Sequence, residues 1–175
     1  MFALTRILVP TNLGEPSQTA VKYGVAFSRQ FGAKLFLVHV LPANTFDAAI
    51  ETERVMEVLG SDAPASTDTE PADEEIARNA ARQDLSQLLD QDDERETRAE
   101  YLLRSYGAEG PDQAIVSCAT ELGVELIVMG KHRLGFVEQL IAGSVTEKVV
   151  RHAPCPVLIV QHPKHEFVVP DSVQR

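Results

Sequence analysis

Cysteine is scarce in this sequence, and its two cysteines form no recognisable motif. Cys118 and Cys155 lie far apart and make no Cys-x-x-Cys pair, so neither a disulfide framework nor a thiolate metal site is indicated. Long apolar runs are also absent, because no stretch approaches the roughly 20 residues that a membrane-spanning helix needs. The first residues, 1–6, run into a predicted strand instead of a charged-then-apolar signal segment. We therefore expect a cytoplasmic protein with no membrane insertion.

Several catalytic patterns are missing as well. The serines lack a Gly-x-Ser-x-Gly elbow, and the sequence has no Walker motif, which disfavours a nucleophilic hydrolase and a P-loop enzyme. The histidines show no metal-ligand spacing with one another or with acidic residues, so we predict no metal site and expect each to be structural or solvated. They are His39, His132, His152, His162 and His165.

The net charge of −10 belongs to one segment. Residues 43–100 contain 17 of the 26 acidic residues but 5 of the 16 basic ones, which gives this segment −12 and leaves +2 on the remainder. A near-neutral remainder argues against a nucleic-acid-binding face. Two interpretations of the acidic segment stay open: a docking surface for a protein partner, or a charge run that only solvates one face.

Apolar periodicity predicts strands and helices in alternation. Short apolar runs indicate buried strands at 7–10, 35–41, 126–129 and 157–160, and an alternating pattern indicates a half-exposed edge strand at 98–105. Helical spacing indicates a first helix with a stripe formed by Ala20, Gly24, Phe27 and Phe31, a second from Pro111 to Gly123, and a last one over about 144–152. Strand, helix and strand at this spacing predict an α/β fold with a doubly wound, five-stranded parallel sheet.

The stretch 43–96 interrupts this alternation. Residues 60–71 lack apolar periodicity, which predicts a mobile linker. A helix is predicted over about 73–90, with an inner face formed by Ile76, Ala80, Leu85, Leu88 and Leu89. We expect a single domain over 1–162, with an acidic, partly mobile insert at about 43–96 and a tail at 163–175.

Residues 143–147 have the spacing of a capped helix start. The Ser144 hydroxyl and the Glu147 carboxylate fit a capping box, and Gly143 allows a close approach to the backbone. Free amides at a helix start can bind phosphate. The spacing alone leaves two interpretations open, a phosphate site and a plain helix cap.

Two segments resemble the universal stress protein family. They are Ile7-Leu8-Val9-Pro10-Thr11 and the long run from Val128-Met129-Gly130 through Gly143-Ser144-Val145-Thr146-Glu147-Lys148-Val149 to His152-Ala153-Pro154-Cys155-Pro156-Val157. The resemblance covers about 1–42 and 97–162. It implies a Rossmann-like sheet of order 3-2-1-4-5, with helices on both faces.

The resemblance also implies a nucleotide site, because many members of the family bind ATP through Gly-x2-Gly-x9-Gly-(Ser/Thr). Gly130 matches the first glycine, next to Met129, while Gly143 and Ser144 match the closing pair. The other residues that the resemblance places at the site are Thr11, Asn12 and Val40 for the nucleoside and Val145 just inside the helix. We expect ATP or another adenine nucleotide as the ligand, with magnesium only through the nucleotide.

Two positions depart from the family pattern. Arg133 stands where the family has its second glycine, so its side chain either fills the phosphate cleft or adds a positive fork that holds a phosphate. Asn12 stands where the family has an aspartate, and it can still accept a hydrogen bond from a ribose hydroxyl. The leading hypothesis is a non-enzymatic stress-response protein that uses nucleotide occupancy to regulate an interaction. The alternative is a nucleotide-free dimeric interaction module.

An enzyme is disfavoured, although slow ATP hydrolysis stays a lesser alternative because no general base is evident. The loop Thr11-Asn12-Leu13-Gly14-Glu15 lacks the Ser-Gly-Gly of adenylating folds. Family members commonly pair through the last strand, and residues 157–161 would expose an apolar edge in a monomer. We therefore expect a homodimer through this strand, besides an unknown protein partner.

Overall fold

The computed structural model describes residues 4–43, 71–130 and 145–160. Its strands form one five-stranded parallel sheet in the order β3-β2-β1-β4-β5, which confirms the predicted doubly wound fold. The strands are β1 (Arg6–Pro10), β2 (Lys34–Pro42), β3 (Glu100–Tyr106), β4 (Leu126–Gly130) and β5 (Val157–Val160). All five strands end at the same side of the sheet, here called the carboxyl edge.

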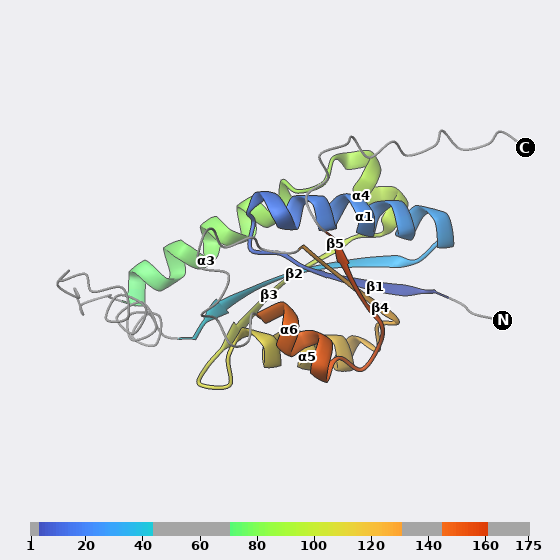
Figure 1. Cartoon of the computed structure of the whole chain (residues 1–175). Helices are drawn as coiled ribbons and strands as arrows, with labels where there is room; N and C mark the ends of the chain where they lie inside the picture. The colour runs from blue at the N-terminus through green and yellow to red at the C-terminus, as the bar shows by residue number, and fades with distance from the viewer. Residues whose placement is uncertain (1–3, 44–70, 131–144, 161–175) are drawn as a thin grey trace, which may run out of the picture.

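Helices cover both faces of the sheet. Figure 1 shows α1, α3 and α4 on one face and α5 and α6 on the other. These helices are α1 (Glu15–Phe31), α3 (Pro71–Ser86), α4 (Gln91–Thr97), α5 (Pro111–Leu122) and α6 (Val145–His152). Because parallel strands need crossover connections, the helices return the chain from the carboxyl edge to the start of the next strand, and α3 and α4 share the connection between β2 and β3.

The apolar core has two halves, one on each face of the sheet. Leu35 and Leu37 of β2 belong to the half beneath α1, whereas Phe36 and Val38 belong to the half beneath α5 and α6. Successive residues of a strand point to opposite faces. Covering both faces therefore explains why β2 is apolar along nearly its whole length.

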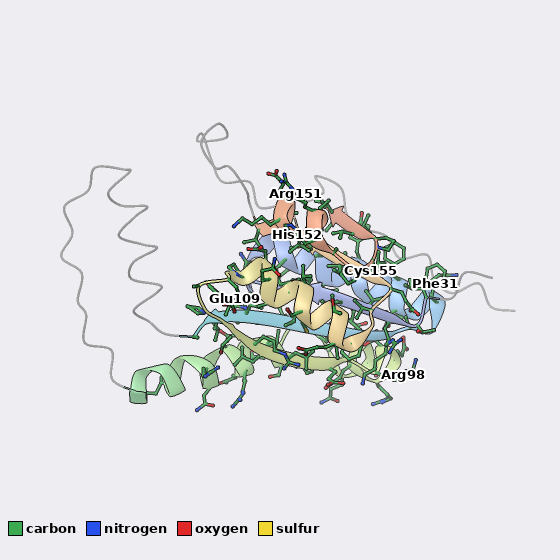
Figure 2. All side chains as sticks on the ribbon, turned by 90° about the horizontal axis from the view of Figure 1, so that it is seen from below. Phe31, Arg98, Glu109, Arg151, His152 and Cys155 are labelled. Carbon is green, nitrogen blue, oxygen red and sulfur yellow. The ribbon has the colours of Figure 1, made fainter. Side chains whose placement is uncertain are left out.

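Helix α1 packs closely on the sheet through Gly24. A Cβ atom on this glycine would lie 2.5 Å from Val9 Cγ2 and 3.2 Å from Leu35 Cδ1. The helix ends as predicted at Gly32, whose φ of 65° is left-handed. The prediction for Phe31 was wrong, because its side chain is 51% exposed at the end of the helix (Figure 2). Phe31 instead stacks on Phe27, with 6.3 Å between the ring centroids.

The acidic segment before β3 forms two helices where the sequence predicted one over 73–90. Helix α3 ends at Ser86, and the Asp90 carboxylate then accepts a 2.7 Å hydrogen bond from the Asp93 amide to start α4. The predicted inner face holds only near the end of the segment, where Leu85 and Leu89 are buried. The predictions for Ile76 and Ala80 were wrong: Ile76 is 65% exposed, and Ala80 is exposed too.

Strand β3 lies at one end of the sheet, as predicted for a half-exposed edge strand. Its Tyr101 packs against the core beneath α1, yet the buried hydroxyl has no hydrogen-bond partner within the described ranges. Burial raises the pKa of Tyr101, and the nearby Glu94 and Asp93 carboxylates raise it further. Arg29 joins α1 to α4 through ion pairs with Asp93 at 2.7 Å and Glu96 at 2.6 Å.

Candidate functional site

The chain reverses its direction across the sheet between β1 and β4. It passes from β1 outward through β2 to β3, and later from β4 outward to β5. Doubly wound sheets bind their ligands beyond the carboxyl ends of the two strands at such a switch point. The end of β1, the end of β4 and the start of the helix after β4 are therefore the places where a ligand site is expected.

Six of the nine predicted site residues come together at this edge. Thr11 and Asn12 follow β1, Val40 lies near the end of β2, and Gly130 ends β4. Met129 is buried beside Gly130, and the half-buried Val40 and Val145 pack against the same apolar cluster as Met129. The remaining three residues, which are Arg133, Gly143 and Ser144, lie outside the described residues, as does the Ser144 half of the predicted capping box.

A hydrogen-bonded turn follows β1. The Thr11 hydroxyl accepts from the Leu13 amide at 3.0 Å, and the Asn12 Oδ1 accepts from the Gly14 amide at 3.1 Å. The Ser17 hydroxyl lies 2.9 Å from the Thr11 hydroxyl, 3.0 Å from Asn12 Oδ1 and 2.7 Å from the Gly14 carbonyl. Because Thr11 is only 4% exposed and Asn12 is exposed, this network holds Asn12 outward on a fixed base.

The turn also stores backbone strain. Leu13 adopts a φ of 64°, a left-handed conformation that costs a residue with a side chain about 1–2 kcal/mol. The bonds from the Leu13 amide to Thr11 and from the Gly14 amide to Asn12 offset this cost. The strained residue thus lies within the turn that carries two of the predicted site residues.

His39 fixes the base of the turn from β2. Its Nδ1 lies 2.7 Å from the Thr11 carbonyl oxygen. Since a carbonyl oxygen can only accept, Nδ1 must carry the hydrogen. His39 was expected to be structural or solvated, and the structure gives it this bond directly beneath the candidate site.

On the other face, α5 and α6 are joined beside the same edge. Lys148 of α6 lies with its Nζ 3.7 Å from Asp112 Oδ1 in the first turn of α5. Asp112 is only 4% exposed, and this oxygen accepts no hydrogen bond from the described residues. Within α6, Arg151 pairs with Glu147 at 3.1 Å. Figure 2 labels Arg151 and His152 at the end of this helix.

The described residues offer little other chemistry. They contain no group of three or more His, Cys, Asp or Glu residues that is placed to hold a metal ion, and none of their helices is both long and apolar enough to cross a membrane. Burial raises the pKa of the Cys118 thiol and of the Cys155 thiol. Neither cysteine is therefore poised as a thiolate nucleophile.

The sequence model of the universal stress protein family matches residues 3–161. The chain belongs to the universal stress protein family. One relative, a Staphylococcus haemolyticus sequence grouped by name with the universal stress proteins, is 30% identical over 167 residues, covering 92% of this chain and 87% of that protein.

Solved universal stress proteins share the fold. A universal stress protein in complex with cAMP has a TM-score of 0.55 and 21% identity, covering 93% of this chain and 100% of that one. One from Archaeoglobus fulgidus in complex with dAMP has a TM-score of 0.54 and 19% identity, covering 91% of this chain and 98% of that one. At these identities the likeness concerns the fold.

Sequence reasoning missed two residues of this universal stress protein that shape the turn. Ser17 was noted only for lacking a hydrolase motif, although a serine three residues after Gly14 at the start of a predicted helix is a signal for local capping bonds. No pattern in the sequence reveals the bond between His39 and Thr11, because 28 residues separate them. Only strand pairing brings these two residues together.

Proposed function

We propose that this universal stress protein binds an adenine nucleotide at the carboxyl edge, between the ends of β1 and β4, and uses occupancy of the site to regulate an interaction. The observation that supports the proposal is that Thr11, Asn12, Val40, Gly130 and Val145 all lie at the carboxyl edge, beside the switch point of the sheet. The two fold relatives in complex with cAMP and dAMP support an adenine nucleotide as the class of ligand.

The division of roles follows from the chemistry of these residues. Val40 and Val145 offer half-buried apolar surface beside Met129, which suits the faces of a purine ring. Gly130 and the start of α6 would lie along the phosphates, with Gly143 and Ser144 as their predicted partners. Magnesium would enter only with the nucleotide, whose phosphates are its ligands.

Calorimetry and thermal unfolding with ATP, AMP and magnesium test the proposal. Ligand at 100 times its dissociation constant should add about 2.7 kcal/mol to the free energy of unfolding. Val40→Gln should weaken binding about tenfold, because it places a polar amide against the purine. Val116→Gln, which changes a half-buried valine in the middle of α5, is the matched control and should leave binding unchanged. No heat and no stabilisation with millimolar nucleotide would reject the proposal.

Arg133 separates the proposal from its alternative, a nucleotide-free interaction module. If its side chain blocks the phosphates, Arg133→Gly should create or strengthen nucleotide binding. If its guanidinium holds a phosphate, Arg133→Gly should bind the nucleotide more weakly than the wild type. Release of inorganic phosphate from ATP, measured beside binding, tests the slow hydrolysis that the sequence analysis left as a lesser alternative.

A homodimer through β5 is the second part of the proposal. Strand β5 lies at the end of the sheet, and its Ile159 is 43% exposed. An exposed apolar edge strand is a ready surface for pairing with another copy. We expect a dimer at micromolar concentration in light scattering, and a monomer for Ile159→Lys. Val150→Lys is the matched control, since Val150 is 48% exposed but lies on α6. A monomeric wild type would reject this part.

A further inference from the structure

The orientation of the Asn12 amide is fixed by its neighbours. The Gly14 amide lies 3.1 Å from Oδ1 and can only donate, so the oxygen and not the nitrogen of the side-chain amide must face it. The Ser17 hydroxyl lies 3.0 Å from the same oxygen and shares its one hydrogen between Asn12 and the Gly14 carbonyl. The Nδ2 group therefore takes part in neither of these bonds.

Asn12 thus presents donors at the carboxyl edge. Its side chain is exposed, and Nδ2 has no hydrogen-bond partner in the part of the chain that the structure describes. The other side-chain oxygen of the turn, that of Thr11, is buried and bonded to the Leu13 amide and the Ser17 hydroxyl. The side chains of this turn consequently offer a ligand two N–H donors and no free acceptor.

This polarity differs from what the resemblance to the universal stress protein family implied. Asn12 was expected to accept a hydrogen bond from a ribose hydroxyl, but its oxygen is already engaged within the protein. A ribose hydroxyl can donate or accept, whereas a ribose oxygen that carries a phosphoryl group can only accept. An uncharged N–H donor can bind either a ribose hydroxyl or a phosphoryl group on the ribose. Its hydrogen bond to the anionic phosphoryl oxygen is stronger than its bond to the neutral hydroxyl.

Resting on the proposed nucleotide site, we propose that Asn12 selects adenine nucleotides whose ribose 3′-oxygen carries a phosphoryl group. Such ligands are 3′,5′-cyclic nucleotides or nucleotides with a 3′-phosphate monoester. A hydrogen bond to a charged group is worth about 1 kcal/mol more than one to a neutral group, which corresponds to a preference of roughly fivefold to tenfold.

Asn12→Asp is the sharpest test, because a carboxylate keeps an oxygen facing the Gly14 amide and the Ser17 hydroxyl but replaces the outward donors by a negative acceptor. Calorimetry on the full chain would compare cyclic AMP with AMP, and adenosine 3′,5′-bisphosphate with its isomer ADP. The wild type should bind the 3′-phosphorylated member of at least one pair about fivefold to tenfold more tightly. Asn12→Asp should abolish or reverse that preference.

Controls separate charge and folding from selectivity. Glu15→Gln, at the first position of α1, changes the net charge by one unit and should leave the ratios unchanged. Thermal unfolding of each variant without ligand shows whether the turn is intact. The cyclic pair and the bisphosphate pair distinguish the two sources of a 3′-phosphoryl group.

The outcomes distinguish this inference from the proposed function. Binding of AMP and ADP with ratios that Asn12→Asp leaves unchanged would overturn the role of Asn12 while nucleotide binding survives. No binding of any of the four nucleotides to the wild type would overturn the nucleotide site itself, and the selectivity with it. A preference that appears in one pair and disappears in Asn12→Asp supports the role of Asn12.

Discussion

Gly24 determines how closely α1 approaches the sheet. Nothing larger fits, since a Cβ atom at this position would lie 2.5 Å from Val9 Cγ2. Val9 belongs to β1, whose end carries the turn with Thr11 and Asn12. The distance between the helix and the strand therefore also sets the position of the candidate site.

Gly24→Ala should lower the free energy of unfolding by about 1–3 kcal/mol, because overpacking forces α1 away from β1. Urea unfolding measures this change. Gln30→Ala, at an exposed position of the same helix, is the control and should stay within about 0.5 kcal/mol of the wild type. A more stable Gly24→Ala protein would show that the helix has room to move outward.

The site residues also show what a sequence does and does not reveal at this scale. Thr11, Asn12, Gly130 and Val145 were predicted from the resemblance to the universal stress protein family, and each lies at or next to the end of an element. The direction of the Asn12 amide was not predictable. It depends on hydrogen bonds with Gly14 and Ser17 that form only once the turn is folded.

At the scale of elements, the strands and the helices next to them were predictable, because their apolar residues recur with the period of the structure. The acidic segment was not. Asp90 starts α4 and Arg98, with a φ of 50°, ends it, but the residues between have few apolar positions to reveal a helix. Ile76 was misplaced for a related reason: α3 packs on the sheet only through its later turns, around Ala81 and Leu85.

The contact between α5 and α6 yields a prediction about a buried charge. Asp112 is paired with Lys148 at 3.7 Å, and the lysine side chain is 52% exposed. Lys148→Met should lower the free energy of unfolding by about 1–2 kcal/mol, less than for a fully buried pair, because water screens part of the interaction.

A double-mutant cycle measured by urea unfolding isolates this interaction. The double variant Asp112→Asn, Lys148→Met should lose less free energy of unfolding than the two single variants lose together. The reason is that the double variant leaves no uncompensated buried charge. Additive single effects would mean that Asp112 and Lys148 do not interact.

At the scale of the whole molecule, the sheet is secured at the side opposite the candidate site by Glu125. Its carboxylate accepts hydrogen bonds from the Thr5 amide at 2.5 Å, the Thr5 hydroxyl at 2.9 Å and the Arg6 amide at 3.0 Å. These bonds, the one from the Thr5 amide first, lower the pKa of Glu125. They connect the start of β1 to the turn before β4.

A lowered carboxyl pKa makes stability depend on acid. Glu125 contributes stability that is present above its unfolded pKa, about 4.3, and is lost as the pH falls through the lower pKa of the folded state. When the pH is lowered from 7 to below 4, the free energy of unfolding should therefore fall less for Glu125→Gln than for the wild type. Urea unfolding at the two pH values measures this difference. Nucleotide binding at pH 7 should not change, because Glu125 lies at the far side of the sheet. An equal loss in both proteins would contradict this role of Glu125.

The buried hydroxyl of Tyr101 gives the molecule an optical property of its own. The sequence contains three tyrosines and no tryptophan, so all its intrinsic fluorescence comes from tyrosine. A variant that keeps Tyr101 and has phenylalanine at Tyr23 and Tyr106 would hold a single emitter, set in the core near the α4 carboxylates. Its emission would follow the loosening of β3 and α4 from the sheet without any attached dye.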